Sequence, residues 1–390
     1  ALNSAQESVS LAEVAFGSGA LKTISSMLLQ AQIHGELDQL EEANQIYQVA
    51  LETSVSAFGE SDATTLSVLD NYGGFLNSID PEMSESVLQE ALRLTTEDDP
   101  QRASRLRVLG LNLQELGRTG EAEVMLSEAL KAYKKVLGEN SPETLSSMAD
   151  LAQLYLTQGK LKPAQELFET ALPLMLEVMK KTSFLILTSK ENLAEIYRQQ
   201  GKFSLAEKLF LESMQGAVAE YGEEDSLVIQ SRSHLAQLYE DTGKLNKALL
   251  LHQQVYEADL ALLGEAHPNT AGDLNNLASV RRRLGDYQKA EKLFRQSLKV
   301  MIAALGEETP QTVSVMNNLA LLLENQGLYD EAEPLLRRAL EGFERTLGPD
   351  HSDTLTLVNN LGVLLQAQGE LKEAEPLYRR ALEGRERTLG

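Results

Sequence analysis

Apolar residues follow the spacing of amphipathic helices along most of the chain. In residues 353–390 a first stripe with helical spacing ends at Gly369, which interrupts it as a C-capping glycine would. A second stripe begins at Leu371 and runs almost to the end of the sequence. Prolines stand where a first helical turn would begin, at Pro142, Pro268 and Pro310. Alternation of β-branched residues is missing, so the pattern predicts pairs of helices and an all-α fold.

The helix pair recurs with a period of 42 residues. A glycine preceded by Leu or Tyr closes most units, at Gly138, Gly222, Gly264, Gly306, Gly348 and Gly390. One set of small residues keeps the same register, at Gly110, Ala152, Ala194, Ala236, Ala278, Ala320 and Gly362. A second set follows twelve residues later, at Ala122, Ala164, Ala206, Ala248, Ala290, Ala332 and Ala374. Small residues on facing sides let the two helices of a hairpin approach closely, so the period predicts a repeat array.

The register predicts nine helix-turn-helix repeats after a short N-terminal segment. We place the repeats at residues 23–59, 64–98, 101–138, 143–180, 185–222, 227–264, 269–306, 311–348 and 353–390. We expect residues 1–22 to form a capping segment over the first repeat, because terminal repeats need a polar outer surface. The sequence begins with Ala1, and we expect it to be a processed form or a fragment of a longer chain.

These features resemble the tetratricopeptide repeat family. The resemblance lies in small residues at the eighth, twentieth and twenty-seventh positions of a repeat, here Gly362, Ala374 and Ala381, with an aromatic residue at Tyr378. The 42-residue period and the sequence of residues 317–348 are similar to the repeats of kinesin light chains. The resemblance implies a right-handed superhelix, or α-solenoid, whose concave groove holds segments of other proteins.

Composition argues against several functional classes. The chain has 35 Lys and Arg against 58 Asp and Glu, and a net charge of −23 does not suit a nucleic-acid-binding surface. It has no cysteine, which excludes disulfides, thiol nucleophiles and thiolate metal sites. No apolar run reaches the roughly 18 residues of a membrane span, so we expect no membrane insertion. We expect a soluble intracellular protein, of the cytoplasm in preference to the chloroplast stroma or another organelle.

No catalytic, cofactor or metal site is predicted. Residues 17–23 partly match a phosphate-binding loop, but they lack the glycine before lysine and the preceding strand. His34 and His252 take positions where other repeats carry core Tyr, Leu or Phe, so we expect them to be buried. His267 and His351 fall in turns between repeats, where we expect them to cap helices. We therefore predict that the chain is not an enzyme and needs no cofactor.

Asparagines recur on the predicted concave face. They occupy the fifth and sixth positions of the first helices, at Asn71, Asn192, Asn275, Asn276, Asn317, Asn318, Asn359 and Asn360. Asparagine is a poor helix former, so its repetition inside helices costs stability unless another interaction offsets it. An amide that donates and accepts suits the backbone of an extended peptide, and the resemblance implies this use. The alternative is that these amides bond neighbouring repeats and support the stack.

Arginines on the same face are candidates for specificity. They lie at the fifth, twelfth and thirteenth positions of first helices, at Arg107, Arg198, Arg282 and Arg283, and Arg281 precedes the last two. In an acidic protein such a group can form a local site for an acidic or C-terminal carboxylate ligand. Acidic residues share this face in nearby repeats, at Glu191, Glu195, Glu240 and Asp241. The alternative is that these carboxylates pair with the arginines.

The sequence therefore predicts a non-catalytic scaffold or adaptor that captures an extended segment or helix of a partner protein in the concave groove. The alternative role is an architectural subunit or assembly factor of a larger complex, for example an organellar one, that contacts its partners through the outer surface. Because the stability of a repeat array is roughly a sum of repeat and interface terms, we expect the two least regular repeats, the first two, to be weakest.

Overall fold

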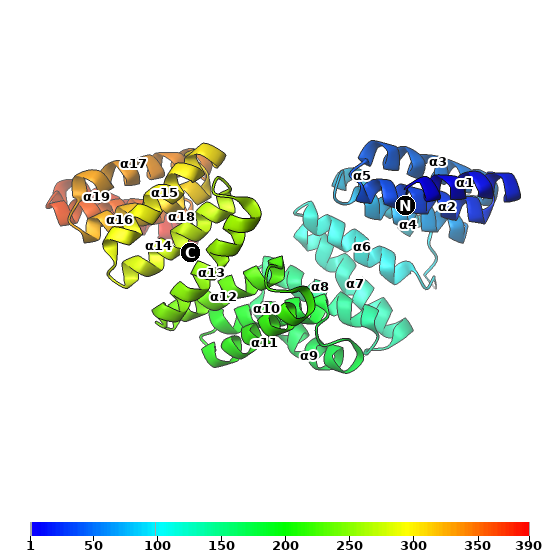
Figure 1. The fold of residues 1–390 in the computed structure, drawn as a ribbon, viewed down its shortest axis with the longest axis horizontal. Helices are drawn as coiled ribbons and strands as arrows, with labels where there is room; N and C mark the ends of the chain where they lie inside the picture. The colour runs from blue at the N-terminus through cyan, green and yellow to red at the C-terminus, as the bar shows by residue number, and fades with distance from the viewer. Residues whose placement is uncertain (1, 98, 390) are drawn as a thin grey trace. The chain divides into compact units, whose positions relative to one another are not determined.

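The structure is a computed structural model that describes residues 2–97 and 99–389. In these ranges it contains nineteen α-helices and no strand, which confirms the predicted all-α class (Figure 1). An N-terminal helix, α1 (Leu2–Phe16), precedes nine helix pairs. The first helices of the pairs are α2 (Leu21–Glu36), α4 (Ala63–Leu76), α6 (Arg102–Glu115), α8 (Pro142–Thr157), α10 (Phe184–Gln199), α12 (Ser226–Asp241), α14 (Pro268–Arg283), α16 (Pro310–Asn325) and α18 (Ser352–Gln368). The second helices are α3 (Leu40–Phe58), α5 (Pro81–Leu94), α7 (Thr119–Leu137), α9 (Leu161–Val178), α11 (Phe203–Tyr221), α13 (Leu245–Leu263), α15 (Tyr287–Leu305), α17 (Tyr329–Thr346) and α19 (Leu371–Leu389).

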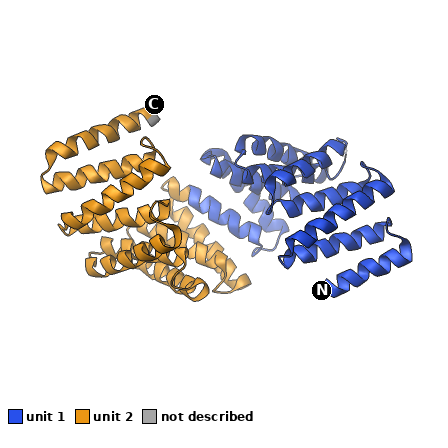
Figure 2. Cartoon of the chain, turned by 90° about the horizontal axis from the view of Figure 1, so that it is seen from above, with its two compact units in different colours: residues 1–196 blue, residues 197–390 orange. Residues whose placement is uncertain are grey.

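The helices form two compact units, residues 1–196 and residues 197–390 (Figure 2). In the first unit α1 packs on α2, and the helices of the pairs α2–α3, α4–α5, α6–α7 and α8–α9 pack on each other. The second unit repeats this arrangement in the pairs α12–α13, α14–α15, α16–α17 and α18–α19. First helices of successive pairs also touch, as α2 does α4 and α14 does α16. The helices of a hairpin therefore pack against each other and against the neighbouring hairpin of the same unit.

The turns between helices use the residues that the sequence supplies for them. Gly285 ends α14 with φ 81° and Gly306 ends α15 with φ 90°, a left-handed conformation that glycine adopts without steric cost. Ser141 caps α8 by accepting a hydrogen bond from the backbone N–H of Thr144. The ring nitrogens of His267 and His351 accept backbone N–H groups at the starts of α14 and α18, which confirms their predicted capping role.

The small residues lie where the hairpins are closest. The alanines of both predicted sets are buried in the core, at Ala122, Ala152, Ala164, Ala194, Ala206, Ala236, Ala248, Ala278, Ala290, Ala320, Ala332 and Ala374. At Gly110 an added Cβ would lie 2.8 Å from Cγ of Leu126, so α6 and α7 pack too closely for a side chain there. The predicted burial of His34 and His252 is also confirmed, with exposed fractions of 5% and 2%.

α1 has the register of a second helix. Gly17 closes it with φ 93°, exactly one 42-residue period before Gly59, which closes α3 with φ 90°. The hydroxyls of Thr23 and Thr65 donate to the carbonyls of these two glycines at 2.8 Å each. Ser8 is exposed, whereas the residues nine before the other closing glycines are buried, at Ala50, Ala129, Ser213, Val255, Ser297 and Ala339. The apolar residues Leu11, Val14 and Phe16 are also exposed, so this helix differs from the polar-surfaced cap that the sequence predicted.

The second hairpin is irregular, and an ion cluster stabilises its end. Helix α5 has 14 residues, against 18 or 19 in the other second helices. Arg105 of α6 is 4% exposed and binds Asp70 of α4 through two hydrogen bonds of 2.8 and 2.9 Å. It also donates to Thr95 and Asp99, which lie in the segment that replaces the missing turn. Burial raises the pKa of Asp70 even though Arg105 opposes the shift.

Candidate functional site

Polar side chains at the fifth and sixth positions join successive first helices of the second unit. The Nδ2 group of Asn318 in α16 donates to Oδ1 of Asn275 in α14 at 3.0 Å. In the same way Nδ2 of Asn360 in α18 donates to Oδ1 of Asn317 in α16 at 2.8 Å. Each bond joins a sixth position to the fifth position of the preceding repeat, 43 residues earlier. We call these four side chains the amide ladder.

The bonds within the amide ladder leave half of its hydrogen-bonding groups unused. In each pair one Nδ2 and one Oδ1 are engaged, while the Nδ2 groups of Asn275 and Asn317 and the Oδ1 atoms of Asn318 and Asn360 have no protein partner among the described residues. All four side chains are half-buried, so the unused groups lie at a surface that water or a ligand can reach. Each pair therefore presents one donor and one acceptor, as a peptide unit does.

The other predicted asparagines are placed differently. Asn192 of α10 donates to Oε1 of Gln153 in α8 at 2.5 Å, which again joins two first helices. Asn71 donates to the carbonyl of Ser67 within its own helix α4. Asn276 and Asn359 are half-buried and form no hydrogen bond within the described part of the chain. The structure thus brings together the asparagines of α14, α16 and α18 and leaves Asn71 outside any such row.

Most of the predicted arginines are paired with carboxylates. Arg107 binds Asp150, and Arg198 binds Asp241, in both cases on the next first helix. Arg283 of α14 donates to Oε2 of Glu240 in α12 at 3.0 Å and to its carbonyl at 2.9 Å. These three contacts also span 43 residues, so the register of the amide ladder recurs at the fifth and sixth positions in Arg107–Asp150 and at the twelfth and thirteenth positions in the other two.

Glu240 is held from its other side by a buried histidine. Its Oε1 atom lies 2.9 Å from Nε2 of His252, which α13 places at the position where other second helices carry Phe, Leu or Tyr. His252 therefore fixes the carboxylate that fixes Arg283. The sequence predicted that His252 is buried but not this contact, because its partner lies on another helix.

Arg282 is the exception among the four predicted arginines. Its Nε atom is buried and has no hydrogen-bond partner, and among the described residues no carboxylate pairs with its side chain. The neighbouring Arg281 pairs with Asp286, with 3.2 Å between its Nη1 atom and the Asp286 Oδ2 atom. Glu324, at the same position of the next first helix, is partly buried, and this burial raises the pKa of its carboxyl group. Arg282 is thus the predicted cation that remains available to a ligand.

A small cavity lies beside the amide ladder. It has a volume of about 300 Å³ and is lined by Asn317 and Val313 of α16, Thr356 and Leu357 of α18, and Phe343 of α17. Its lining combines apolar side chains with polar ones, among them Asp353 of α18. The cavity is large enough for one side chain of a bound segment.

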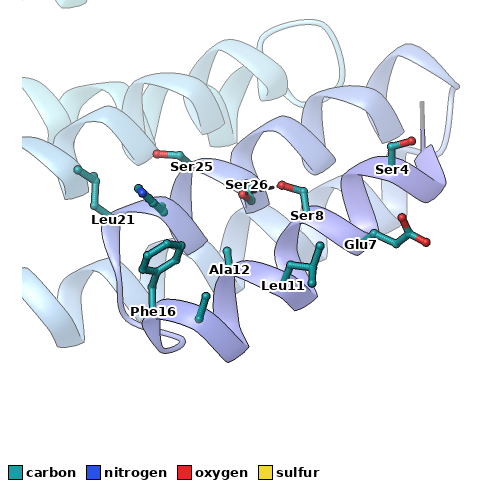
Figure 3. Close-up of a pocket in the computed structure, with 11 residues that line it drawn as sticks. Ser4, Glu7, Ser8, Leu11, Ala12, Phe16, Leu21, Ser25 and Ser26 are labelled. Carbon is teal, nitrogen blue, oxygen red and sulfur yellow. Dashed lines mark hydrogen bonds between the residues drawn. The ribbon is translucent and has the colours of Figure 1, made fainter.

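A larger groove lies between α1 and α2 in the first unit. Figure 3 shows Phe16, Leu11 and Ser8 of α1 facing Leu21, Ser25 and Ser26 of α2 across it. The hydroxyls of Ser8 and Ser26 are 3.1 Å apart, and the Lys22 ammonium lies 4.3 Å from the centre of the Phe16 ring. Few charged groups converge on this groove, so we take the amide ladder with Arg282 as the candidate site.

Metal ligation and membrane spanning were two further possibilities for the described residues. Nowhere among them do three His, Asp or Glu side chains come together as metal ligands would. In the same part of the chain, every helix is too short or too polar to cross a bilayer.

Comparison with known proteins identifies the repeat. A family model described as "Tetratricopeptide repeat" matches residues 101–177, 185–261, 251–303, 270–324 and 311–387. None of the curated proteins compared with the chain matches it. The apo form of RapI is similar over 94% of this chain and 98% of its own, with a TM-score of 0.69 and 15% identity.

Two further structures are similar to the chain. The apo form of the quorum sensor NprR from B. thuringiensis matches over 93% of this chain and 98% of its own, with a TM-score of 0.66 and 15% identity. BtubC from P. vanneervenii is 25% identical and covers 60% of this chain and 92% of its own, with a TM-score of 0.49. The likeness to RapI and NprR shows the fold alone, an array of helix pairs over nearly the whole chain.

Proposed function

This chain belongs to the tetratricopeptide repeat family, and from that premise we propose that it is a non-catalytic scaffold that binds a segment of another protein along the amide ladder. Repeats of this family generally serve as protein-interaction modules. The observation that carries the proposal is that each Asn pair leaves one donor and one acceptor unused at the surface. An extended segment presents the complementary groups of its backbone whatever its sequence.

The ladder gains from being pre-organised. Its amides are already held by bonds to neighbouring repeats, so little side-chain entropy is lost when a ligand binds. The bonds thus support the stack and orient the free groups, and the two interpretations of the asparagines are compatible. The cavity beside Asn317 would take one side chain of the bound segment.

Arg282 would supply selectivity for an acidic segment. A guanidinium without a carboxylate partner can donate two parallel hydrogen bonds to a carboxylate, which Arg283 and Arg198 cannot do without breaking existing pairs. The rest of the chain is strongly acidic, with a net charge of −23, so an acidic ligand is attracted only near such a group.

The experiment compares groove variants with a matched control. The chain, an Asn318→Ala/Asn360→Ala variant and an Arg282→Ala variant are used to retain partners from extract of the source cells, identified by mass spectrometry. A retained segment is then titrated as a labelled peptide. We expect at least a tenfold loss of affinity in the first two variants with unchanged helicity, and little change in Arg337→Ala, whose side chain pairs with Glu333 on a second helix.

The architectural role is the second candidate. It is favoured by the same ladder, because amides that bond each other already have a structural use. In that case partners are retained equally by the groove variants, and they are lost when exposed second-helix side chains such as Arg337 and Arg379 are reversed in charge.

A further inference from the structure

One buried and one half-buried carboxylate lie where α13 packs on α14. Asp273 of α14 is 8% exposed, and its Oδ2 atom has no hydrogen-bond partner. Asp259 of α13 occupies the facing position, where an earlier repeat places Met175 Sδ 4.0 Å from Ser189 Oγ, and its charge acts on Asp273. Two charged carboxylates in neighbouring positions repel each other, and burying the charge of Asp273 is costly. Both effects favour a protonated Asp273.

The same pair of positions is uncharged between the other regular repeats, and only the repeat after the irregular second hairpin carries a charge there, at Arg105. Asp259 lies five residues before a closing glycine, and Asp273 is the third residue of the next first helix by repeat numbering. The equivalent pairs are Ser54 and Val68, Tyr133 and Ser147, Ala217 and Ser231, Met301 and Val315, and Phe343 and Leu357. All of these side chains are buried. The fold therefore accepts small or apolar side chains here, and the acidic pair is a departure that packing does not require.

Nothing that is charged compensates the pair. Asp259 is the one charged group that acts on Asp273. Thr270 of α14 faces the same region and its hydroxyl lies 3.4 Å from the Asp259 carbonyl, while α15 contributes Ser297, bonded to the Ala271 carbonyl, and Met301. Among the described residues, no group of α12, α15 or α16 forms an ion pair or hydrogen bond with either carboxylate.

We propose that the contact between α13 and α14 is a proton-dependent joint, which is closed while Asp273 is protonated and weakens when that proton is lost. A protonated Asp273 is uncharged and can donate a hydrogen bond to the Asp259 carboxylate, so the pair then carries a single negative charge. Loss of the proton leaves a charged, buried Asp273 beside the half-buried Asp259, with no cation acting on it. Opening the joint lets water reach Asp273 and separates the two charges.

The direction of the pH effect follows from the titration. Burial and the neighbouring Asp259 raise the pKa of Asp273 from its ordinary 3.8 to about 8. Between these values the closed joint holds a proton that the open joint releases. The closed state is therefore favoured at the acidic end of this range and loses stability as the pH rises through it, up to about pH 8. One proton of difference changes the opening equilibrium by about tenfold per pH unit.

Hydrogen exchange of the full chain tests the joint without any ligand. Exchange is followed by mass spectrometry between pH 5.5 and 8.5 in the wild type, in Asp273→Ser and in Asp259→Ala/Asp273→Ser. The double variant reproduces the pair Ala217 and Ser231 of the preceding repeat, so it suits the fold. Glu265→Gln, an exposed change of the same charge in the following turn, is the control.

We expect the exchange rate of α13 and α14 in the wild type, divided by the rate in either serine variant, to rise by up to about tenfold per pH unit between pH 6 and 8. Intrinsic exchange depends on pH and on the local sequence, so it cancels in this ratio for the peptides of α13 and α14 that contain no substituted residue. The ratio for α18 and α19 should stay constant, and Glu265→Gln should behave as the wild type does. A ratio for α13 and α14 that does not change with pH would overturn the proposal, and so would an equal change in α18 and α19. Neither outcome bears on ligand binding at the amide ladder.

Discussion

Single residues decide how this array handles its buried charges. Arg105 serves three acceptors at the irregular second hairpin, and it is the partner that keeps Asp70 ionised in a site where burial disfavours the charge. Arg105 stands at a position where most regular repeats carry small or apolar core residues. The short α5 leaves the carboxylates of Asp70 and Asp99 and the hydroxyl of Thr95 within reach of its guanidinium.

We expect Arg105→Met to destabilise the first unit by about 3 kcal/mol, because it leaves the Asp70 carboxylate partly buried without a partner. Without the guanidinium the pKa of Asp70 rises further, so the loss should be smaller near pH 4 than at pH 7. Urea unfolding at both pH values measures it. Arg93→Met, which removes an exposed pair with Glu90, should leave the free energy of unfolding close to that of the wild type. Equal effects of the two substitutions would show that the buried cluster adds nothing.

The sequence predicted which positions form the candidate site, but it did not predict the hydrogen-bond and ion-pair partners of these residues. The recurrence of Asn275, Asn317 and Asn359 on one helical face was visible in the 42-residue period. The contacts run at 43 residues, because successive first helices are offset by one position, and no single-helix pattern contains that offset. Arg282 and Arg283 look equivalent in the sequence, but successive side chains of a helix point about 100° apart. Arg283 therefore reaches the carboxylate of Glu240, whereas Arg282 does not.

At the scale of the helices, the ends are fixed by short-range chemistry that differs from repeat to repeat. Ser141 and Thr309 both precede a proline at the start of a first helix. The Ser141 hydroxyl accepts the Thr144 N–H at 3.1 Å, whereas the Thr309 side chain makes no capping bond to the backbone of α16. The two residues therefore offer a matched comparison of a cap that is used and one that is not.

We expect Ser141→Ala to cost about 1 kcal/mol, the usual contribution of a capping hydroxyl, and Thr309→Ala to cost clearly less. The free energy of unfolding of the two variants and the wild type is compared in urea under the same conditions. The prediction fails if both alanines cost the same, since the proline would then account for the start of each helix by itself.

The helices themselves were well predicted because periodicity, glycine and proline all act within one turn. The pairing of helices followed from the small residues, which are buried as expected. Two features could not be read in this way. The short α5 breaks the period, and α1 contains only fifteen residues, so its register became clear only from Gly17 and the hydroxyl of Thr23. Contacts between such elements depend on geometry that a stretch of sequence does not contain.

For the whole molecule, the stability of a repeat array is a sum of local terms, so it need not be uniform. One continuous cluster of buried residues extends from α14 to α19 and includes Phe294, Leu336 and Leu361. The clusters that hold α2 to α5 are small and separate, as those around Ile24, Tyr47 and Leu66 show. Buried apolar area is the main stabilising term, which favours the C-terminal repeats over the first two.

We therefore expect amides of α2 to α5 to exchange faster than those of α14 to α17 in the full chain. We also expect a core substitution to accelerate exchange only in the helices near it. Tyr47→Ala should cost about 3 to 5 kcal/mol and accelerate exchange in α1 to α5, while leaving α14 to α19 unchanged. Phe294→Ala should cost a similar amount and act on α14 to α17. Hydrogen exchange read by mass spectrometry distinguishes these patterns. Uniform protection in the wild type, or acceleration of every helix by either variant, would mean that the chain unfolds as one cooperative body, because coupling between repeats would then exceed the difference between their cores.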